Sequence, residues 1–313
     1  MRAAILDIGS NTAKVLVAEK NDHGDLLKID EKSLPCRLAK GLAREKFNLS
    51  NEAIESTLQV VDQLISFSQG FLPNITKIVA TEALRRLKNA DVLIDRIKKC
   101  YGLPIEILTG HQEASLIAKG LMTDPKLSSL SEFYAIDLGG GSLEIIQVVN
   151  GSVQYIESLP LGAVVMAEQF LGDLSKKPTL SCILSLQEHA VNILKNAFFK
   201  LPERSFHLVG TGGSVIFLRK IISRLNKVEF INQSILCLND IENIANQVNS
   251  LCLSKRISRF NDLPPDRADV FPAALIAIIE IMKFLDLSNL THSFHNLRYG
   301  LAQELLSDPD SPT

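Results

Sequence analysis

The chain has 313 residues, of which 46% are hydrophobic, and its 33 basic and 35 acidic residues give a net charge of −2. This length corresponds to about two domains and is sufficient for substantial hydrophobic cores. The near balance of charge excludes a generally basic nucleic-acid-binding surface and an acidic disordered tail.

The first half of the chain alternates predicted strands and helices. Apolar runs predict strands over Arg2–Leu6, Val15–Glu19, Asp25–Asp30, Lys77–Ala80 and Pro104–Leu108. Helical spacing predicts a helix that begins after Ser50, and further helices over Asp91–Lys99 and His111–Leu121. This alternation is typical of an α/β layer.

Near Phe133 the pattern restarts. Strands are predicted over Phe133–Ile136, Leu143–Val149 and Ser152–Ser158, and Asn150-Gly151 is a strong hairpin signal. In both halves a strand runs into an Asp-x-Gly turn and a second strand leads into a hairpin. This internal repeat predicts two related domains with facing loops.

The polar segment Met122–Ser131 is the candidate domain boundary. We therefore expect domains over residues 1–125 and 126–313, and leave open whether the last helix packs back on the first domain. The second domain is expected to continue with a strand over Phe206–Gly210 and with helices over Leu184–Phe199, Val215–Ile222, Asp240–Leu251, Pro272–Leu285 and Leu297–Leu306.

The first loop with candidate chemistry is Asp7-Ile8-Gly9-Ser10-Asn11-Thr12. Gly9 permits a tight backbone whose amides can point at an anion, and Ser10 and Asn11 add side-chain donors. Asp7 could hold a metal directly or through water. Taken alone, the loop is as well interpreted as an ordinary polar turn, because Asp-x-Gly is common in turns.

Two further glycine-rich loops follow. In Asp137-Leu138-Gly139-Gly140-Gly141-Ser142-Leu143-Glu144, three glycines between apolar strands suggest close backbone approach to a ligand. Asp137 and Glu144 flank these glycines and could reach a divalent cation. The loop Gly210-Thr211-Gly212-Gly213-Ser214 lies between a strand and a helix and is a third potential anion site. It is neither a Walker loop nor a dinucleotide fingerprint.

The three loops together resemble those of the actin-like ATPase superfamily, in which Asp-x-Gly loops of duplicated domains grip phosphates across a cleft. A series of motifs resembles more closely the exopolyphosphatase and guanosine-pentaphosphate phosphohydrolase (Ppx/GppA) family in its short, two-domain form. The matching segments are Asp7–Thr12, Ala80–Arg85 with Asn89, Pro104–Ala114, Asp137–Glu144, Leu159–Ala163, Gly210–Gly213, Arg267–Val270 and Leu297–Gly300. The resemblance implies an α/β fold of two duplicated ribonuclease-H-like domains with a cleft between them.

The resemblance also implies the activity, a Mg²⁺-dependent hydrolase that releases terminal phosphate from inorganic polyphosphate or the 5′-phosphate of guanosine pentaphosphate (pppGpp). Glu113 would act as base toward the attacking water and Arg85 would contact phosphate. Mg²⁺ would be held by Asp137 and Glu144, together with Asp7. Phosphates would be cradled by Ser10, Asn11, Gly139, Gly140, Gly141, Ser142, Gly212 and Gly213, with Arg37 and Arg267 as additional candidates.

Some residues depart from the family pattern. His111 and Gln112 precede Glu113 where acidic residues are usual, and Leu143 stands where threonine is common. The first departure leaves open a nucleotide- or polyphosphate-binding sensor with weak turnover. An actin-like ATPase or sugar kinase is the other alternative, although no sugar-binding signature is present. The sequence does not choose between polyphosphate and pppGpp.

No segment indicates a membrane or a secreted protein. The longest apolar run, near Val270–Leu285, is interrupted by Glu280 and Lys283 and predicts a buried helix. The five cysteines are scattered and lack a CxxC pair, which argues against a disulfide framework and a cysteine metal site. We expect a cytoplasmic protein without nucleic-acid or membrane partners. A homodimer is implied only by the family resemblance.

Overall fold

The computed structural model describes residues 1–38, 48–197 and 207–307. They form two compact units, one of Met1–Ser128 with His295–Thr313 and the other of Ser129–Phe294. The chain therefore passes between the units twice, after Ser128 and after Phe294. The predicted helix end at Phe199 and the predicted strand start at Phe206 lie outside the described residues.

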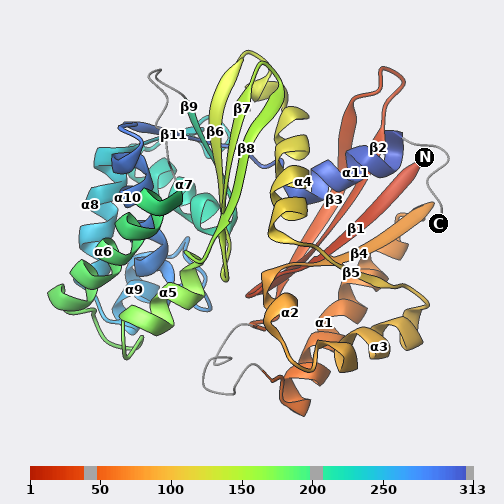
Figure 1. Ribbon diagram of the computed structural model, residues 1–313, viewed down its shortest axis with the longest axis horizontal. Coiled ribbons are helices and arrows are strands. Elements are labelled where there is room, and N and C mark those ends of the chain that lie inside the picture. Colours follow the sequence, from red (N-terminus) through yellow and green to blue (C-terminus); the bar gives the residue numbers. More distant parts are fainter. Residues whose placement is uncertain (39–47, 198–206, 308–313) are drawn as a thin grey trace. The chain divides into compact units, whose positions relative to one another are not determined.

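The first unit is built on a five-stranded sheet of order β3-β2-β1-β4-β5 (Figure 1). Its strands are β1 (Arg2–Ile8), β2 (Thr12–Lys20), β3 (Leu26–Pro35), β4 (Ile75–Ala80) and β5 (Ile105–Ile107). Its helices are α1 (Asn51–Gln69), α2 (Glu82–Arg86), α3 (Ala90–Tyr101), α4 (Gly110–Met122) and α11 (Leu297–Ser307), with a short 3₁₀ helix over Pro125–Leu127.

Burial explains the central strand of this unit. Successive residues Ala3, Ala4, Ile5 and Leu6 of β1 are fully buried, so both faces of the strand are covered. Both α1 and α11 pack on the sheet. The start predicted for α1 is confirmed, because the Ser50 hydroxyl accepts a hydrogen bond from the Ala53 amide.

The second unit is built on a six-stranded sheet of order β10-β11-β9-β6-β7-β8. Its strands are β6 (Glu132–Leu138), β7 (Leu143–Val149), β8 (Ser152–Leu159), β9 (His207–Thr211), β10 (Ile235–Cys237) and β11 (Asn289–His292). Its helices are α5 (Ala163–Phe170), α6 (Leu180–Ala197), α7 (Gly213–Asn226), α8 (Leu238–Asn249), α9 (Leu253–Arg259) and α10 (Phe271–Phe284). Among them, α10 is the apolar helix predicted near residue 270, and it packs against α5, α6 and α8.

The first four strands of each unit are arranged in the same way, as the sequence repeat predicts. In each, a first strand pairs antiparallel with the second and parallel with the fourth, so that β1, β2, β3 and β4 correspond to β6, β7, β8 and β9. The ladder irregularity also recurs, between Val17 and Ala18 in the first unit and between Gln147 and Val148 in the second. The hairpin predicted at Asn150-Gly151 is confirmed, since both residues have the positive φ of a type I′ turn.

Candidate active site

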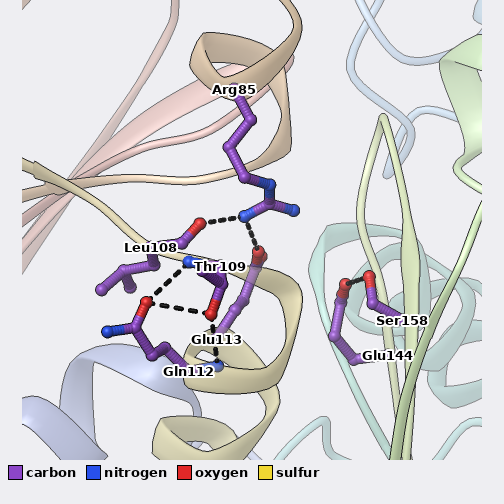
Figure 2. Close-up of polar contacts among 7 residues, drawn as sticks. All are labelled: Arg85, Leu108, Thr109, Gln112, Glu113, Glu144 and Ser158. Carbon is purple, nitrogen blue, oxygen red and sulfur yellow. Dashed lines mark hydrogen bonds and ion pairs between the residues drawn. The ribbon is translucent and has the colours of Figure 1, made fainter.

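Glu113 lies in the first turn of α4, in a position set by a capping box. The Thr109 hydroxyl accepts from the Gln112 amide at 3.2 Å, and Gln112 Oε1 accepts from the Thr109 amide at 2.8 Å (Figure 2). This reciprocal pair fixes where the helix begins. The Glu113 side chain is consequently buried, with 10% of its surface exposed.

The partner of Glu113 is Arg85, the other residue expected to be catalytic. Arg85 comes from the short helix α2, and its Nη1 donates to Glu113 Oε2 at 3.1 Å and to the Leu108 carbonyl oxygen (Figure 2). One guanidinium nitrogen thus ties α2 to the end of β5 and to α4. The sequence places both residues in the site but does not predict that they pair.

Strand order explains why these residues gather. The strands β1, β4 and β5 are parallel neighbours, with Ile8 opposite Ala80 and Ala80 opposite Ile107. The loop with Ser10 follows β1, Arg85 follows β4 and Glu113 follows β5. Chemistry-bearing loops of α/β sheets occur at the carboxyl ends of the strands. In the first unit all three segments start from that edge.

The loop after β1 is braced by the chain that follows β3. The Asn11 carbonyl oxygen accepts from the Cys36 amide at 3.1 Å and from the Arg37 amide at 3.0 Å. Ser10 and Asn11 are both buried. Arg37 adopts a positive φ of 48°, which is uncommon for a residue with a side chain. Arg37, a candidate anion contact, therefore lies directly beside the first loop.

In the second unit, four polar residues form a row across neighbouring strands. Thr211 of β9 lies opposite Asp137 of β6, Asp137 opposite Glu144 of β7, and Glu144 opposite Ser158 of β8. Residues opposed in this way carry their side chains on the same face of the sheet. The row brings together two carboxylates that the sequence assigned to a metal site.

The glycine loop between β6 and β7 has a packing role that the sequence did not reveal. The Gly139 carbonyl accepts from the Ala163 amide at 2.9 Å, and the Gly140 carbonyl accepts from the Val164 amide at 2.9 Å. A Cβ on Gly162 would lie 2.1 Å from the Gly141 carbonyl carbon. Glycine is therefore required at position 162, where the start of α5 packs on the loop and its amides bind the loop's carbonyl oxygens.

The third loop lies against the row. Gly212 has a φ of 95°, and a Cβ there would lie 2.7 Å from Asp137 Oδ1. Only glycine fits such a backbone next to the carboxylate. A Cβ on Gly213 would lie 3.8 Å from Arg267 Nη2. Arg267, considered from the sequence as an additional anion contact, thus lies at the N-terminus of α7 beside the third loop.

Comparison with known proteins decides the family. The model of the Ppx/GppA phosphatase family matches residues 16–308. The chain belongs to that family. The crystal structure of the Aquifex aeolicus family member is 27% identical, with 99% of each chain covered and a TM-score of 0.81. A crystal structure of an exopolyphosphatase from Cytophaga hutchinsonii has a TM-score of 0.87 at 21% identity, with 98% of each chain covered.

Membership of the Ppx/GppA family confirms the predicted fold class, and it supports a phosphatase that acts on a phosphoanhydride. No helix among the residues that the structure describes has both the length and the apolar character that crossing a bilayer requires.

The capping box explains the role of Gln112, one of the residues that depart from the family pattern. Its Oε1 acts only as an acceptor in the capping box, so glutamine serves there as well as the acidic residue of the family pattern.

Two other residues of the family motifs have local roles. His111 is exposed at the start of α4. Asn89 accepts from the Leu49 amide at 2.9 Å and donates to the Leu49 carbonyl at 3.0 Å, which braces the chain just before α1. Asn89 is therefore a structural member of the motif that contains Arg85.

The Ppx/GppA resemblance implies a divalent metal, and the donor set of the second unit fits Mg²⁺. Magnesium is usually bound by one or two carboxylates with substrate phosphates and water. Asp137 and Glu144 supply two carboxylates on one face of one sheet. Among residues 1–38, 48–197 and 207–307, no group of three or more His, Cys, Asp or Glu side chains forms a metal-binding cluster.

The duplicated unit shows how Asp7 differs from Asp137. Asp7 lies opposite Lys14, in the register that places Asp137 opposite Glu144. The turns between these strands match as well, because Gly9 donates to the Thr12 carbonyl and Gly139 donates to the Ser142 carbonyl. A lysine therefore occupies in the first unit the place of the second carboxylate. At this register position, two carboxylates oppose each other in the second unit, and an aspartate opposes a lysine in the first.

Proposed function

We propose that this family member hydrolyses a terminal phosphoanhydride bond of inorganic polyphosphate or of the 5′-phosphates of pppGpp. The observation that carries the proposal is the buried Glu113 at the start of α4, held by Arg85 Nη1 at 3.1 Å. A carboxylate that is shielded from solvent and held by an arginine is suited to orient a water molecule beside a bound phosphate.

In the proposed reaction, water attacks the terminal phosphorus and the bond from phosphorus to the bridging oxygen breaks. Glu113 orients the water and takes up its proton, and the shortened chain leaves with the bridging oxygen. Arg85 uses one nitrogen for Glu113 and Leu108, and its planar fork has further N–H groups suited to phosphate oxygens. Arg85 thus links the position of the base to the position of the phosphate.

Phosphate binding is assigned to the loops of both units. Ser10 and Asn11 supply donors from the first unit, and Gly139–Ser142 and Gly212–Gly213 supply backbone amides from the second. The N-terminus of α7, which spans fourteen residues, carries positive potential that favours an anion beside Gly213. Arg267 lies beside that same point, with its Nη2 3.8 Å from where a Cβ on Gly213 would be, and its guanidinium is suited to phosphate oxygens.

Mg²⁺ is proposed as the cofactor, with Asp137 and Glu144 as its protein ligands and Asp7 as a further candidate. When bound, the ion neutralises charge on the phosphate oxygens. The protein's own contribution is to hold two carboxylates at one place on a rigid sheet. The sensor alternative rests on His111 and Gln112 together; Gln112 has a structural role in the capping box, and a measurement of turnover tests the alternative.

The base is tested by Glu113→Gln, which keeps the shape of the side chain but cannot accept a proton. We expect phosphate release from polyphosphate and pppGpp to fall by about 10²–10⁴-fold, the range typical of a lost general base, with substrate binding retained. Glu106→Gln is the matched control, because Glu106 pairs with Lys77 at 2.8 Å on nearby β5. Equal turnover in the two variants would show that the base is assigned wrongly.

A further inference from the structure

Ser158 lies at the end of the polar row in the second unit, and its hydroxyl donates to Glu144 Oε1 at 2.7 Å (Figure 2). Glu144 is almost fully buried, with 1% of its surface exposed. A buried carboxylate is costly unless donors or a cation compensate it. The Ser158 hydroxyl supplies one such donor.

The position of Ser158 is set from both sides. Before it, β8 pairs with β7 in a continuous register that ends with Leu159 opposite Leu143. After it, Gly162 packs directly against the backbone of Gly140 and Gly141. Groups that orient a functional side chain are most effective when rigid elements carry them. Ser158 is therefore held in place by the same packing that shapes the glycine loop.

The other end of the row behaves differently. The Thr211 hydroxyl donates to the Ile136 carbonyl oxygen at 3.5 Å, and so to the backbone rather than to a carboxylate. In the first unit, the residue equivalent to Ser158 is Ser33, which lies opposite Lys14 and is exposed. Ser33 thus lies opposite a lysine, whereas Ser158 lies opposite a glutamate. The serine–carboxylate pair is thus particular to the unit that carries both acidic residues.

We infer that Ser158 is a positioning residue for metal binding: its hydroxyl holds the Glu144 carboxylate in the orientation that a divalent cation requires. This inference rests on the proposed role of Glu144 as a metal ligand. Partners that orient metal ligands in this way typically contribute about 10–100-fold to metal affinity. No sequence motif singles out Ser158 for this role. Only the register across β6, β7 and β8 shows it.

The test measures Mn²⁺ binding to the full chain, without substrate, from the electron paramagnetic resonance signal of the free ion. Ser158→Ala is expected to weaken binding about 10–100-fold. The Ser158→Thr and Ser158→Val variants have nearly the same shape and differ in the hydroxyl. The Thr variant should therefore bind Mn²⁺ about tenfold more tightly than the Val variant, the lower end of the range for such partners. This pair decides the question even if the alanine variant does not fold.

Ser33→Ala removes the equivalent hydroxyl in the first unit and is the matched control, with wild-type binding expected. Phosphate release should reflect the weaker metal binding: the turnover of Ser158→Ala should be reduced at low Mg²⁺ and should return toward the wild-type value in excess Mg²⁺. Equal affinity in the Thr and Val variants would overturn the inference, because the hydroxyl would then contribute nothing.

Glu144→Gln separates this inference from the proposed function. If Glu144→Gln loses Mn²⁺ binding while Ser158→Ala and Ser158→Val bind normally, the metal site stands and the role of Ser158 is wrong. If Glu144→Gln itself binds as wild type, the metal assignment fails, and the inference about Ser158 fails with it.

Discussion

At the scale of single residues, Arg85 connects three segments of the site. Its Nη1 serves both Glu113 and the Leu108 carbonyl, and 23% of its side-chain surface is exposed. A lysine has a single nitrogen and lacks the planar fork of a guanidinium. The site therefore requires arginine for geometry and not only for charge.

Arg85→Lys should lower kcat/KM for polyphosphate about 10–100-fold, because a hydrogen bond between charged groups contributes about 1.5–3 kcal/mol. Steady-state phosphate release measures this. Arg86→Lys is the control on the same short helix, since Arg86 pairs with Glu82 at 3.1 Å on the surface. If Arg85→Lys keeps as much kcat/KM as the control Arg86→Lys, then Arg85 contributes only its positive charge.

The sequence indicates which residues carry chemistry but not how they contact each other. Glu113, Arg85, Asp137 and Glu144 were predicted as site residues from motifs. Their contacts depend on strand register and on helix starts, which motifs do not contain. One signal was nevertheless present: Lys14 follows Asp7 by the same spacing as Glu144 follows Asp137. That spacing already placed a lysine where the other half has a carboxylate.

At the scale of elements, the close crossing of α4 and α11 is decisive for the first unit. A Cβ on Gly300 would lie 1.9 Å from the Leu116 carbonyl oxygen, and one on Gly120 would lie 2.1 Å from the Asn296 carbonyl oxygen. Both obstacles are backbone atoms, which cannot move aside easily. The crossing joins the helix that carries Glu113 to the last helix of the chain.

Gly300→Ala is expected to reduce the free energy of unfolding by about 3 kcal/mol, the upper end of the range for overpacking, because the contact is with backbone. Urea denaturation measures the change. Gln303→Ala on the same helix should leave stability within about 0.5 kcal/mol, as expected of a substitution outside the core. A stable Gly300→Ala protein would show that the two helices can separate without cost.

Next to this crossing, His295 stacks on Tyr299, and its Nδ1 lies 2.7 Å from the Thr123 hydroxyl oxygen. Burial lowers the pKa of His295 from its usual 6.5, although Asp124 acts in the opposite direction. The unfolded chain therefore takes up a proton more readily than the folded one. Stability from this group is present above pH 6.5 and decreases as the pH falls below that value.

The free energy of unfolding of the wild type should accordingly drop between pH 7.5 and pH 5.5, and His295→Gln should show a smaller drop. Glu31 does not interfere in this window. Burial raises its pKa, but Arg298 and Lys28 together hold it below 4.5. An identical pH dependence in wild type and variant would contradict a buried neutral histidine.

The long helices and most strands were predictable, whereas the short helices and two short strands of the second unit were not. The predicted strands and the helices α1, α3, α4, α6, α7, α8, α10 and α11 are present with bounds shifted by a few residues. The sequence did not reveal α2, α5, α9, β10 and β11, which span eight residues or fewer. Such segments hold too few periods of an apolar pattern to be recognised, and tertiary contacts determine them. Arg85 lies on one of them.

At the scale of the whole molecule, duplication is the organising feature. The sequence repeat predicts two related units, and the equivalent strand orders, turns and ladder irregularities confirm them. The units have diverged in charge: a lysine and an aspartate oppose each other in one, and two carboxylates in the other. The same strand arrangement thus carries different charged residues at equivalent positions of the two units.

The net charge of −2 does not exclude a highly charged phosphate substrate. Backbone amides, a helix N-terminus and a few arginines can concentrate positive potential locally without a basic surface. Substrate choice is a property of side chains around the phosphates and not of the fold. Membership of the Ppx/GppA family therefore supports phosphoanhydride chemistry, and a direct comparison of turnover distinguishes polyphosphate from pppGpp as substrate.

The most direct test of the central claim is phosphate release by the purified protein from long-chain polyphosphate, pppGpp and ATP, each with and without Mg²⁺. We predict Mg²⁺-dependent release from polyphosphate, pppGpp or both, with ATP a poor substrate. No release from polyphosphate or pppGpp despite measurable binding, or release that is unaffected by removing divalent ions, would contradict the proposed function.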